Sequence, residues 1–366
     1  MTNINIHESI TLEKYIHERN MNHNIESEDY SLFCAYSIGI IKAEIKPKLK
    51  VIAKESGFDV VDISEFINGT YNELKISLLL RDEIKKINQK AEIIFDSFIV
   101  PRENNTKTKT SKVYCSAQKR GLDGIEYLVM IAVLDKKIKV VGIKRLKTKP
   151  DLINESINLV NEYLTYKEIS LVMADNHFFH EVLINHLREK NIDFVSKPKK
   201  SHVWISASSS EGLKLSDCFK NIPIDGYRHS SKYKVYTRAL ILTHRLYGTC
   251  KIVKVKPSYK AEESKCFYIV STNINLSAMS IFKAKKKRWK IETVFRDCSQ
   301  NLGLRACQCT SSKAIDNNVF MSFFTYNFLS EIREKYGSTI GLIKRKILKG
   351  FSYTTNVSDL FIKEIA

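Results

Sequence analysis

In the stretch "AEIIFDSFIV" (91–100), Asp96 has apolar residues on both sides, within "IIFDSFIV" (93–100). Its length and its β-favouring residues predict a strand in the interior of a sheet. A carboxylate in such a strand leaves water, which is unfavourable unless it is paired with a cation or bound to a metal. Asp96 is therefore a candidate functional residue, and a loop-starting or capping aspartate is the competing interpretation.

The segments that follow predict the rest of the sheet. The order is three strands, a helix, a strand, a helix and a strand, which favours an α/β fold with a mixed sheet and helices packed on it. After Asp96's strand, the predicted elements are strands "KVYCSAQ" (112–118), "EYLVMIAVL" (126–134) and "KIKVVGIKRL" (137–146), helix "PDLINESINLVNEYLTY" (150–166), strand "ISLVMAD" (169–175), helix "HFFHEVLINHLREKN" (177–191) and strand "IDFVSKP" (192–198).

Outside this core the chain divides into further segments. Residues 1–88 space apolar residues three and four apart and predict a small helical domain, in which "DVVDISEFINGTYNEL" (59–74) is either a helix-turn-helix for DNA binding or plain helical packing. Residues 199–277 are strand-like and predict an inserted β subdomain between the two parts of the core. The first part of the core is then 89–198, and residues 278–366 are expected to be its C-terminal helices.

The charge of the chain favours a polyanionic partner. Of 366 residues, 59 are Lys or Arg and 40 are Asp or Glu, a formal net charge of +19. Such an excess is self-repulsive unless a polyanion screens it, and nucleic acid is the usual one. The alternative is a generally basic composition, since Lys, Ile and Asn are abundant throughout.

No apolar run approaches the about 20 residues that span a bilayer. The polar start "MTNINIHESI" has no signal-peptide core, so an intracellular protein without a membrane partner is expected. The eight cysteines are scattered and are expected to be reduced thiols. Cys307 and Cys309 form a CxC and His177 and His180 an HxxH, but neither has a second pair at zinc-finger spacing, so no structural zinc is expected.

A second and a third acid stand out. Asp175 ends "ISLVMAD", at the C-terminal edge of a predicted strand, where α/β folds place ligands and catalytic groups. Alternatively it caps the next helix. The third, Glu292, lies in "KKRWKIETVFRDCSQNLGL" (286–304), which predicts one basic amphipathic helix.

At 100° per residue, this helix has an apolar stripe facing the core, formed by Ile291, Phe295, Cys298 and Leu302. A neighbouring stripe holds Arg288, Glu292, Arg296 and Ser299, with Lys285 close to it. Taken alone, Glu292 between two arginines is an exposed ion-pair residue. In a sheet of this order, however, the three acids would converge and hold two divalent ions, the arrangement used in phosphodiester chemistry.

At these residues the sequence resembles the DDE transposases with a ribonuclease-H-like core, and in particular the insertion-sequence family 4 group. The matching stretches are "IIFDS", "LVMAD" and "KKRWKIETVFRDCSQNLGL", within a resemblance that covers about 90–330. It implies that Asp96, Asp175 and Glu292 are the catalytic, metal-binding triad for Mg²⁺, with Mn²⁺ able to substitute, and that the β insertion is the one typical of the group.

The chain departs from the group's signature, which is Tyr, two residues, Arg, three residues, Glu, six residues, Lys. Arg288 and Glu292 fit, but Lys285 stands at the tyrosine position and Ser299 at the lysine position. In the family that lysine helps to hold a phosphate of the transposon end. Ser299 keeps a hydrogen-bond donor without the charge, which predicts either a rebuilt phosphate pocket or a weakened enzyme.

The resemblance implies a transposase that cuts the ends of its element and joins the freed 3′-hydroxyls to target DNA. Its partners would be double-stranded DNA with terminal inverted repeats, target DNA and a second copy in a synaptic complex, in a prokaryotic cytoplasm near the nucleoid. Lys285, Arg288, Trp289, Arg296 and Ser299 are the expected DNA contacts. Trp289 either stacks on a base or packs against the protein. The alternatives are a weakened or repurposed DNA-binding protein of the same fold, and a ribonuclease-H-like nuclease that only cleaves.

Overall fold

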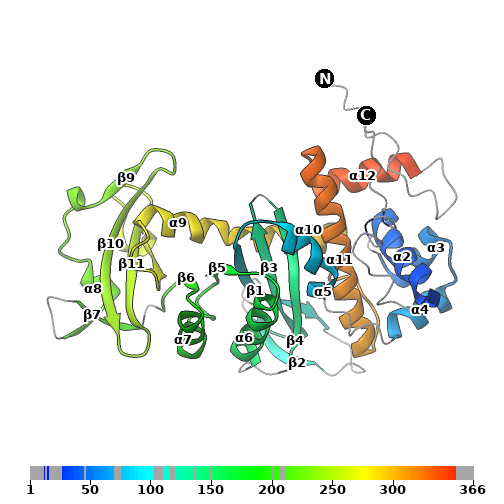
Figure 1. Ribbon diagram of the computed structural model, residues 1–366, viewed down its shortest axis with the longest axis horizontal. Coiled ribbons are helices and arrows are strands. Elements are labelled where there is room, and N and C mark those ends of the chain that lie inside the picture. Colours follow the sequence, from blue (N-terminus) through cyan, green and yellow to red (C-terminus); the bar gives the residue numbers. More distant parts are fainter. Residues whose placement is uncertain are drawn as a thin grey trace, which may run out of the picture. The chain divides into compact units, whose positions relative to one another are not determined.

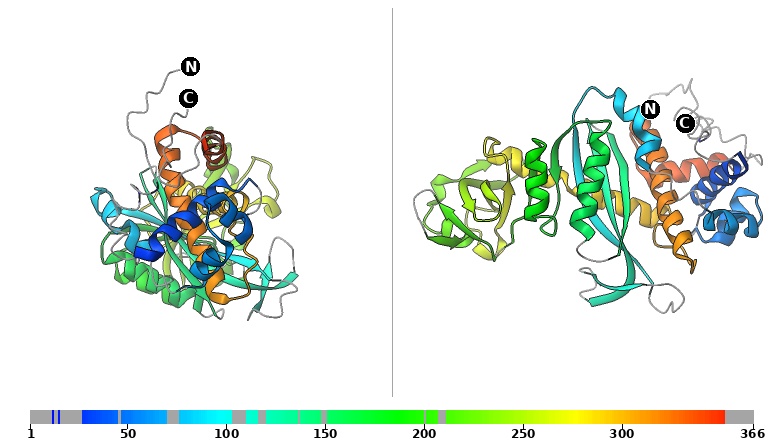
Figure 2. Two further views of the ribbon diagram at one scale, coloured as in Figure 1. Left: turned by 90° about the vertical axis from the view of Figure 1, so that its right-hand side faces the viewer. Right: turned by 60° about the horizontal axis from the view of Figure 1, so that its bottom comes forward.

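The computed structural model of the protein describes residues 12, 15, 27–44, 47–69, 76–102, 110–115, 120–135, 137–147, 151–199, 201–206 and 211–351. The chain forms two compact units, drawn in Figures 1 and 2. The first unit holds residues 1–89, 97–147 and 292–366, and the second holds 90–96 and 148–291.

The first unit begins with short helices, as the sequence predicts for this region. They are α2 (Ser27–Lys42), α3 (Leu49–Ser56), α4 (Val60–Asn68) and α5 (Ile76–Lys86). Gly57 ends α3 with a φ of 79°, which a residue with a side chain adopts less readily, and Asp59 caps α4 by accepting a hydrogen bond from Val61 N at 2.6 Å. The helix predicted over "ESITLEKYIHERN" (8–20) lies outside the described residues apart from 12 and 15, and the helix-turn-helix segment lies outside them from 70 to 74.

The strands of the first unit form an antiparallel meander. β2 (Ser111–Cys115) and β4 (Lys137–Leu146) both pair with β3 (Arg120–Leu134), and the end of β1 (Ala91–Pro101) is hydrogen-bonded beside β3. These strands confirm the predicted ones. β3 begins earlier than its apolar run indicates, because "RGLDG" (120–124) pairs with β2.

The core of the first unit is built on α11 (Ser312–Tyr336), which is buried along most of its length and packs against β4, α2, α4 and α12 (Ile340–Phe351). A helix that is buried on nearly all sides needs no amphipathic stripe. Most of α10 (Trp289–Asn301) also belongs to this unit. An aromatic cluster joins β1, β3, α10 and α11, and its members are Phe98, Tyr127, Phe295 and Phe323.

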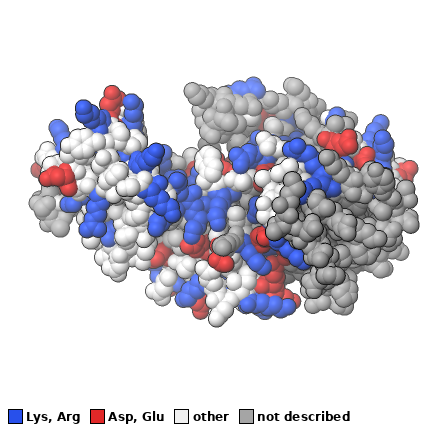
Figure 3. Space-filling model, turned by 90° about the horizontal axis from the view of Figure 1, so that it is seen from above, with Lys and Arg blue, Asp and Glu red and all other residues white. Residues whose placement is uncertain are grey.

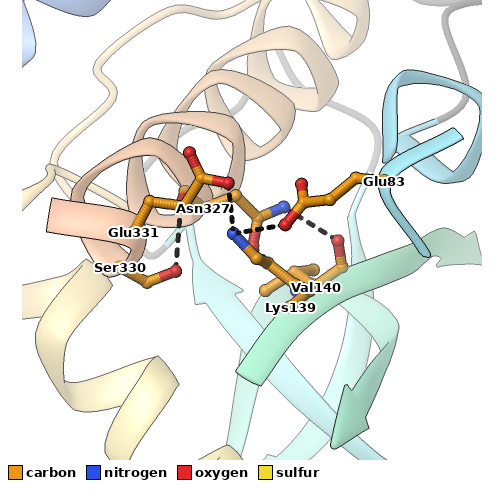
Figure 4. A network of polar contacts seen from close by, with 6 residues as sticks. All are labelled: Glu83, Lys139, Val140, Asn327, Ser330 and Glu331. Carbon is orange, nitrogen blue, oxygen red and sulfur yellow. Dashed lines mark hydrogen bonds and ion pairs between the residues drawn. The ribbon is translucent and has the colours of Figure 1, made fainter. Parts of the chain in front are cut away.

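A buried lysine fastens α11 to β4 and α5 (Figure 4). Lys139 is 1% exposed, and its Nζ lies 3.2 Å from Glu331 Oε1 and 3.5 Å from Glu83 Oε1. Beside it, the Asn327 amide bonds both backbone groups of Val140, accepting from N at 2.8 Å and donating to O at 2.9 Å. Two carboxylates and an amide thereby compensate the desolvation of the ammonium and of the strand backbone.

The second unit contains the parallel part of the sheet. β1 pairs in parallel with β5 (Ile169–Met173), and β5 pairs in parallel with β6 (Asp193–Ser196). The connections are α6 (Asp151–Leu164) and α7 (Glu181–Glu189), which pack side by side (Figure 2). The strand–helix–strand–helix–strand order predicted from the sequence is confirmed.

The inserted strands continue the sheet of the second unit. β12 (Phe267–Ser271) pairs antiparallel with β6, so the return strand of the insertion is hydrogen-bonded to the core. α9 (Ala278–Lys287) then packs against β6, β10, β11 and β12. The other elements are β7 (Val203–Ser206), β8 (Gly212–Lys214), α8 (Leu215–Cys218), β9 (Arg228–Ser230), β10 (Val235–His244) and β11 (Gly248–Lys256), with 3₁₀ turns at Ile224–Gly226 and Glu263–Lys265.

The fold is thus α/β, a mixed ribonuclease-H-like sheet flanked by helices, with an inserted β subdomain and N-terminal helices, as the sequence predicts. None of the helices in the described part of the chain is both long enough and apolar enough to span a bilayer.

Candidate active site

Two of the three predicted acids lie at the same end of neighbouring parallel strands. In the register of β1 and β5, Ile94 is the partner of Met173. Asp96 comes two residues later within β1, and Asp175 comes two residues after Met173, just past the end of β5. This register therefore brings both residues to the carboxyl end of the strand pair, where α/β folds place ligands and catalytic groups.

The backbone around Asp175 is held by hydrogen bonds from both sides. Ser196 Oγ, at the end of β6, donates to Asp175 O at 2.6 Å, and Asp175 Oδ1 accepts from His177 N at 2.8 Å. α7 begins only at Glu181, where the side chain of His180 accepts from Val182 N and caps the helix. The alternative in which Asp175 caps this helix is therefore wrong, because His180 has that role.

Asp96 lies within β1 and is paired with Arg288. Arg288 Nη1 donates to Asp96 Oδ2 at 2.7 Å, and the side chains are 10% and 19% exposed, respectively. The cost of placing a carboxylate in a central strand is therefore met by a charge-assisted hydrogen bond. Arg288 was expected on an exposed stripe beside Glu292, and the structure instead buries it against Asp96.

The helix predicted over 286–304 is divided at Arg288 into α9, which ends at Lys287, and α10, which begins at Trp289. Arg288 itself keeps a right-handed helical conformation, with φ −52° and ψ −31°. The neighbouring Lys287 forms an ion pair with Glu92, four residues before Asp96 on β1. Two consecutive cations at the helix junction thus pair with two acids on one face of one strand, a contact for which the sequence gives no signal because each pair joins distant segments.

Glu292 lies half-buried in the first turn of α10. The apolar stripe expected on this helix is confirmed, with Ile291, Cys298 and Leu302 fully buried. Phe295 is half-buried in the aromatic cluster. On the neighbouring stripe Arg296 is exposed and Ser299 is half-buried.

The end of α9 is strongly basic and carries Lys283, Lys285, Lys286 and Lys287. Lys286 Nζ lies 4.9 Å from the centroid of the Tyr233 ring, whereas Lys285 is half-buried. Trp289, which follows this run, is 60% exposed and so is not a core packing residue. Figure 3 shows groups of Lys and Arg side chains in the view from above, with Asp and Glu side chains among them. Exposed cations beside an exposed indole suit contact with a phosphate backbone and its bases.

The donor chemistry of the predicted site fits a hard divalent cation. Carboxylate oxygens are the ligands that Mg²⁺ takes in proteins, and Asp96 and Asp175 provide two of them at the same end of the strand pair. In the described part of the chain no three His, Cys, Asp or Glu side chains are already gathered as a metal cluster. His180 is engaged through Nδ1 as the cap of α7.

Residues 88–328 match the family model described as the transposase DDE domain. Since the match spans well over half of the chain, the chain belongs to this transposase family. One similar solved structure is the Drosophila P element transposase strand transfer complex, with 11% sequence identity, coverage of 94% of this chain and 72% of that chain, and a TM-score of 0.27. No curated protein matches the chain.

Proposed function

We propose that the protein is a DNA transposase that cuts at the ends of its element and joins the 3′-hydroxyls to target DNA. The observation that supports this proposal is the register of β1 and β5, in which Asp96 and Asp175 follow the paired residues Ile94 and Met173, in a chain of the transposase DDE domain family. The proposal extends to the insertion-sequence family 4 type, on the Arg288 and Glu292 spacing.

In this proposal Asp96, Asp175 and Glu292 hold two Mg²⁺ ions, or Mn²⁺ in their place. Such ions activate a water or a 3′-hydroxyl and stabilise the leaving oxygen of the phosphodiester. Ser196 fixes the backbone of Asp175 through the bond to its carbonyl oxygen. Arg288 orients the Asp96 carboxylate and is near enough to contact a phosphate bound there.

DNA binding is proposed for the basic end of α9 and for α10. Lys285 and Arg296 would contact phosphates, Trp289 would stack on a base, and Ser299 would donate a hydrogen bond where the related group has a lysine. We also propose a homodimer that pairs two inverted-repeat ends, acting in the cytoplasm at the nucleoid.

The test uses the full chain, Mg²⁺ or Mn²⁺, and DNA carrying the inverted repeats that flank the coding sequence. Joined product supports a transposase, cleavage without joining indicates a nuclease, and binding alone indicates a repurposed DNA-binding protein. Asp96→Asn is expected to abolish cleavage and to leave end binding within a few-fold, since the amide keeps the size but loses the charge. Asp123→Asn, at an exposed position on β3, is the matched control. Substantial cleavage by Asp96→Asn would contradict the assignment of Asp96 as a catalytic, metal-binding residue.

A further inference from the structure

A second reactive group lies in the connection between α10 and α11, within the first unit. Cys307 is buried there and Cys309 is half-buried, with the exposed Gln308 between them. The CxC has no role in the proposed DNA chemistry. A buried cation, Arg102, lies close to this pair. Its position and hydrogen bonds influence the ionisation and the reactivity of the two thiols.

Arg102 is fixed at both of its ends. Its backbone N donates to Asp123 O at 2.7 Å, and its Nη1 donates to Cys307 O at 2.5 Å. The residue is only 7% exposed, and its Nε and Nη2 have no hydrogen-bond partner within the described ranges. A guanidinium stays protonated even when buried, so this site carries a full positive charge with donors directed into a buried space.

No carboxylate among the residues with described positions forms an ion pair with Arg102. A buried charge without a counter-charge is strongly unfavourable, so the site calls for an anion. The hydrogen bond from the Cys309 thiol lowers the pKa of Cys307, and the positive charge of Arg102 lowers it further. The same thiol bond raises the pKa of Cys309. Burial opposes these effects at Cys307, but the balance favours the thiolate on Cys307 over Cys309, and such a thiolate would supply the anion beside Arg102.

The other described cysteines lie in a different environment. Burial raises the pKa of Cys218 and raises that of Cys298 well above its usual range. Thiolates are the reactive form in oxidation, so Cys307 should react ahead of both. Two sulfurs alone are too few for a closed zinc site, and no cluster of three ligands is assembled among the described side chains, which favours a thiol–disulfide pair over a metal site.

We propose that Cys307 and Cys309 form a peroxide-sensitive pair that closes to an intrachain disulfide. The Cys307 thiolate attacks one oxygen of hydrogen peroxide, the O–O bond breaks, and hydroxide leaves as Cys307 becomes a sulfenic acid. The Cys309 sulfur then attacks the Cys307 sulfur, the S–O bond breaks, and water leaves with the thiol proton. The hydroxide released in the first step takes a proton from solvent, so peroxide is reduced to two waters while the thiolate and the thiol are oxidised to one disulfide.

The disulfide has a direct structural consequence. It removes the negative charge beside Arg102 and leaves the guanidinium buried without it. Arg102 directly follows β1 and is bonded to the carbonyl of Cys307, so oxidation acts on the contact between the end of this strand and the α10–α11 connection. The oxidised protein is therefore expected to unfold at a lower urea concentration than the reduced protein.

The test treats the full-length reduced protein with stoichiometric hydrogen peroxide at pH 7 and maps each cysteine by peptide mass spectrometry. The expected product is a peptide containing both Cys307 and Cys309 that has lost the mass of a hydrogen molecule and regains it with a reductant. In a parallel iodoacetamide experiment Cys307 is expected to be alkylated at least about tenfold faster than Cys218, which serves as the internal control.

Three variants separate the roles. Cys309→Ser should stop the reaction at a sulfenic acid on Cys307, which dimedone traps. Arg102→Gln removes the charge and should slow alkylation of Cys307 several-fold. If Arg102→Gln does not fold, Cys309→Ala replaces it, because it leaves Arg102 intact and removes the hydrogen bond to the thiolate. Alkylation of Cys307 no faster than that of Cys218, or peroxide treatment without the disulfide, would overturn the proposal.

Discussion

Arg288 and Asp96 form a hydrogen-bonded ion pair, with Nη1 and Oδ2 2.7 Å apart, between a turn after α9 and the central strand β1. The arginine lies four residues before Glu292, and the aspartate is one of the two acids brought to the same end of the parallel strands. A cation therefore already engages the carboxylate to which the proposed chemistry assigns a metal. Binding of that metal and pairing with Arg288 therefore involve the same carboxylate.

Removal of the Arg288 side chain should strengthen metal binding in the absence of DNA. A hydrogen bond to a charged group contributes about 1.5–3 kcal/mol, and partial exposure of this pair reduces it. We expect Arg288→Ala to bind Mn²⁺ about three- to tenfold more tightly in isothermal titration calorimetry while cleaving end DNA more slowly. Arg228→Ala, at an exposed position on β9, is the control. Unchanged or weaker Mn²⁺ binding by the Arg288 variant would show that Mn²⁺ and Arg288 do not compete for Asp96.

Restoring a lysine at Ser299 should improve DNA binding. Ser299 occupies the position at which the related group has a phosphate-binding lysine, and it is half-buried on α10. Ser299→Lys is expected to tighten binding of end DNA and to steepen its dependence on salt concentration by about one unit of slope. Gln300→Lys adds the same charge at the next, exposed position. Equal effects of the two substitutions in filter-binding titrations would show that only net charge matters.

Ser196 should act as a positioning residue for Asp175. Its hydroxyl donates to Asp175 O at 2.6 Å, and its loss removes one hydrogen bond worth about 1 kcal/mol of unfolding free energy. Ser196→Ala is expected to lower the rate of DNA cleavage by more than this stability change explains. Ser170→Ala, which removes a similar 3.2 Å bond to Ala91 O on β1, is the matched control. A comparable loss of cleavage rate in both variants would contradict a specific role.

Lys344 should make stability depend on alkaline pH. Burial lowers the pKa of Lys344 from 10.5 to about 8 in the folded protein, and its Nζ donates to Ile40 O and Asn301 O. Between these two values the unfolded chain binds more protons, so the free energy of unfolding should rise with pH in this window. Below about pH 8 both states are protonated and the full cost, about 3 kcal/mol, is present.

The measurement is urea unfolding of wild type and Lys344→Met at several pH values from 7 to 10. The difference in unfolding free energy between them is expected to change in favour of wild type as pH rises. Lys346→Met, at an exposed position on the same helix, should follow wild type at every pH. Parallel curves for Lys344→Met and wild type would show that this lysine does not titrate in the window.

The strands and helices around Asp96 and Asp175 are predictable because their apolar patterns are local. The parallel pairing of β1 with β5 follows from the alternation of strands and helices, and it places the two aspartates at one end of the sheet. Glu292 can be recognised as a candidate metal ligand only in combination with the two aspartates, because the pattern of its helix alone predicts a basic surface with ion pairs.

Local sequence patterns do not predict the contacts that charged residues make with distant segments of the chain. The segment 286–304 contains no Pro, and its only Gly is Gly303, so its sequence predicts helix, and Arg288 has helical backbone angles. What the local pattern does not predict is the contact of Arg288 with Asp96 on a distant strand. The contact between Arg102 and Cys307 cannot be predicted from local sequence patterns either, because it joins the residue after β1 to a connection 205 residues away.

The two ion pairs on β1 also bear on how the chain folds. Lys287 and Glu92 are 195 residues apart, and Arg288 and Asp96 are 192 apart. Contacts of such sequence separation slow folding, because the intervening chain has to be ordered first. During synthesis β1 therefore emerges long before its cations. A fragment that stops before α9 would retain Glu92 and Asp96 as uncompensated charges in a central strand, and is expected to remain unfolded or to aggregate.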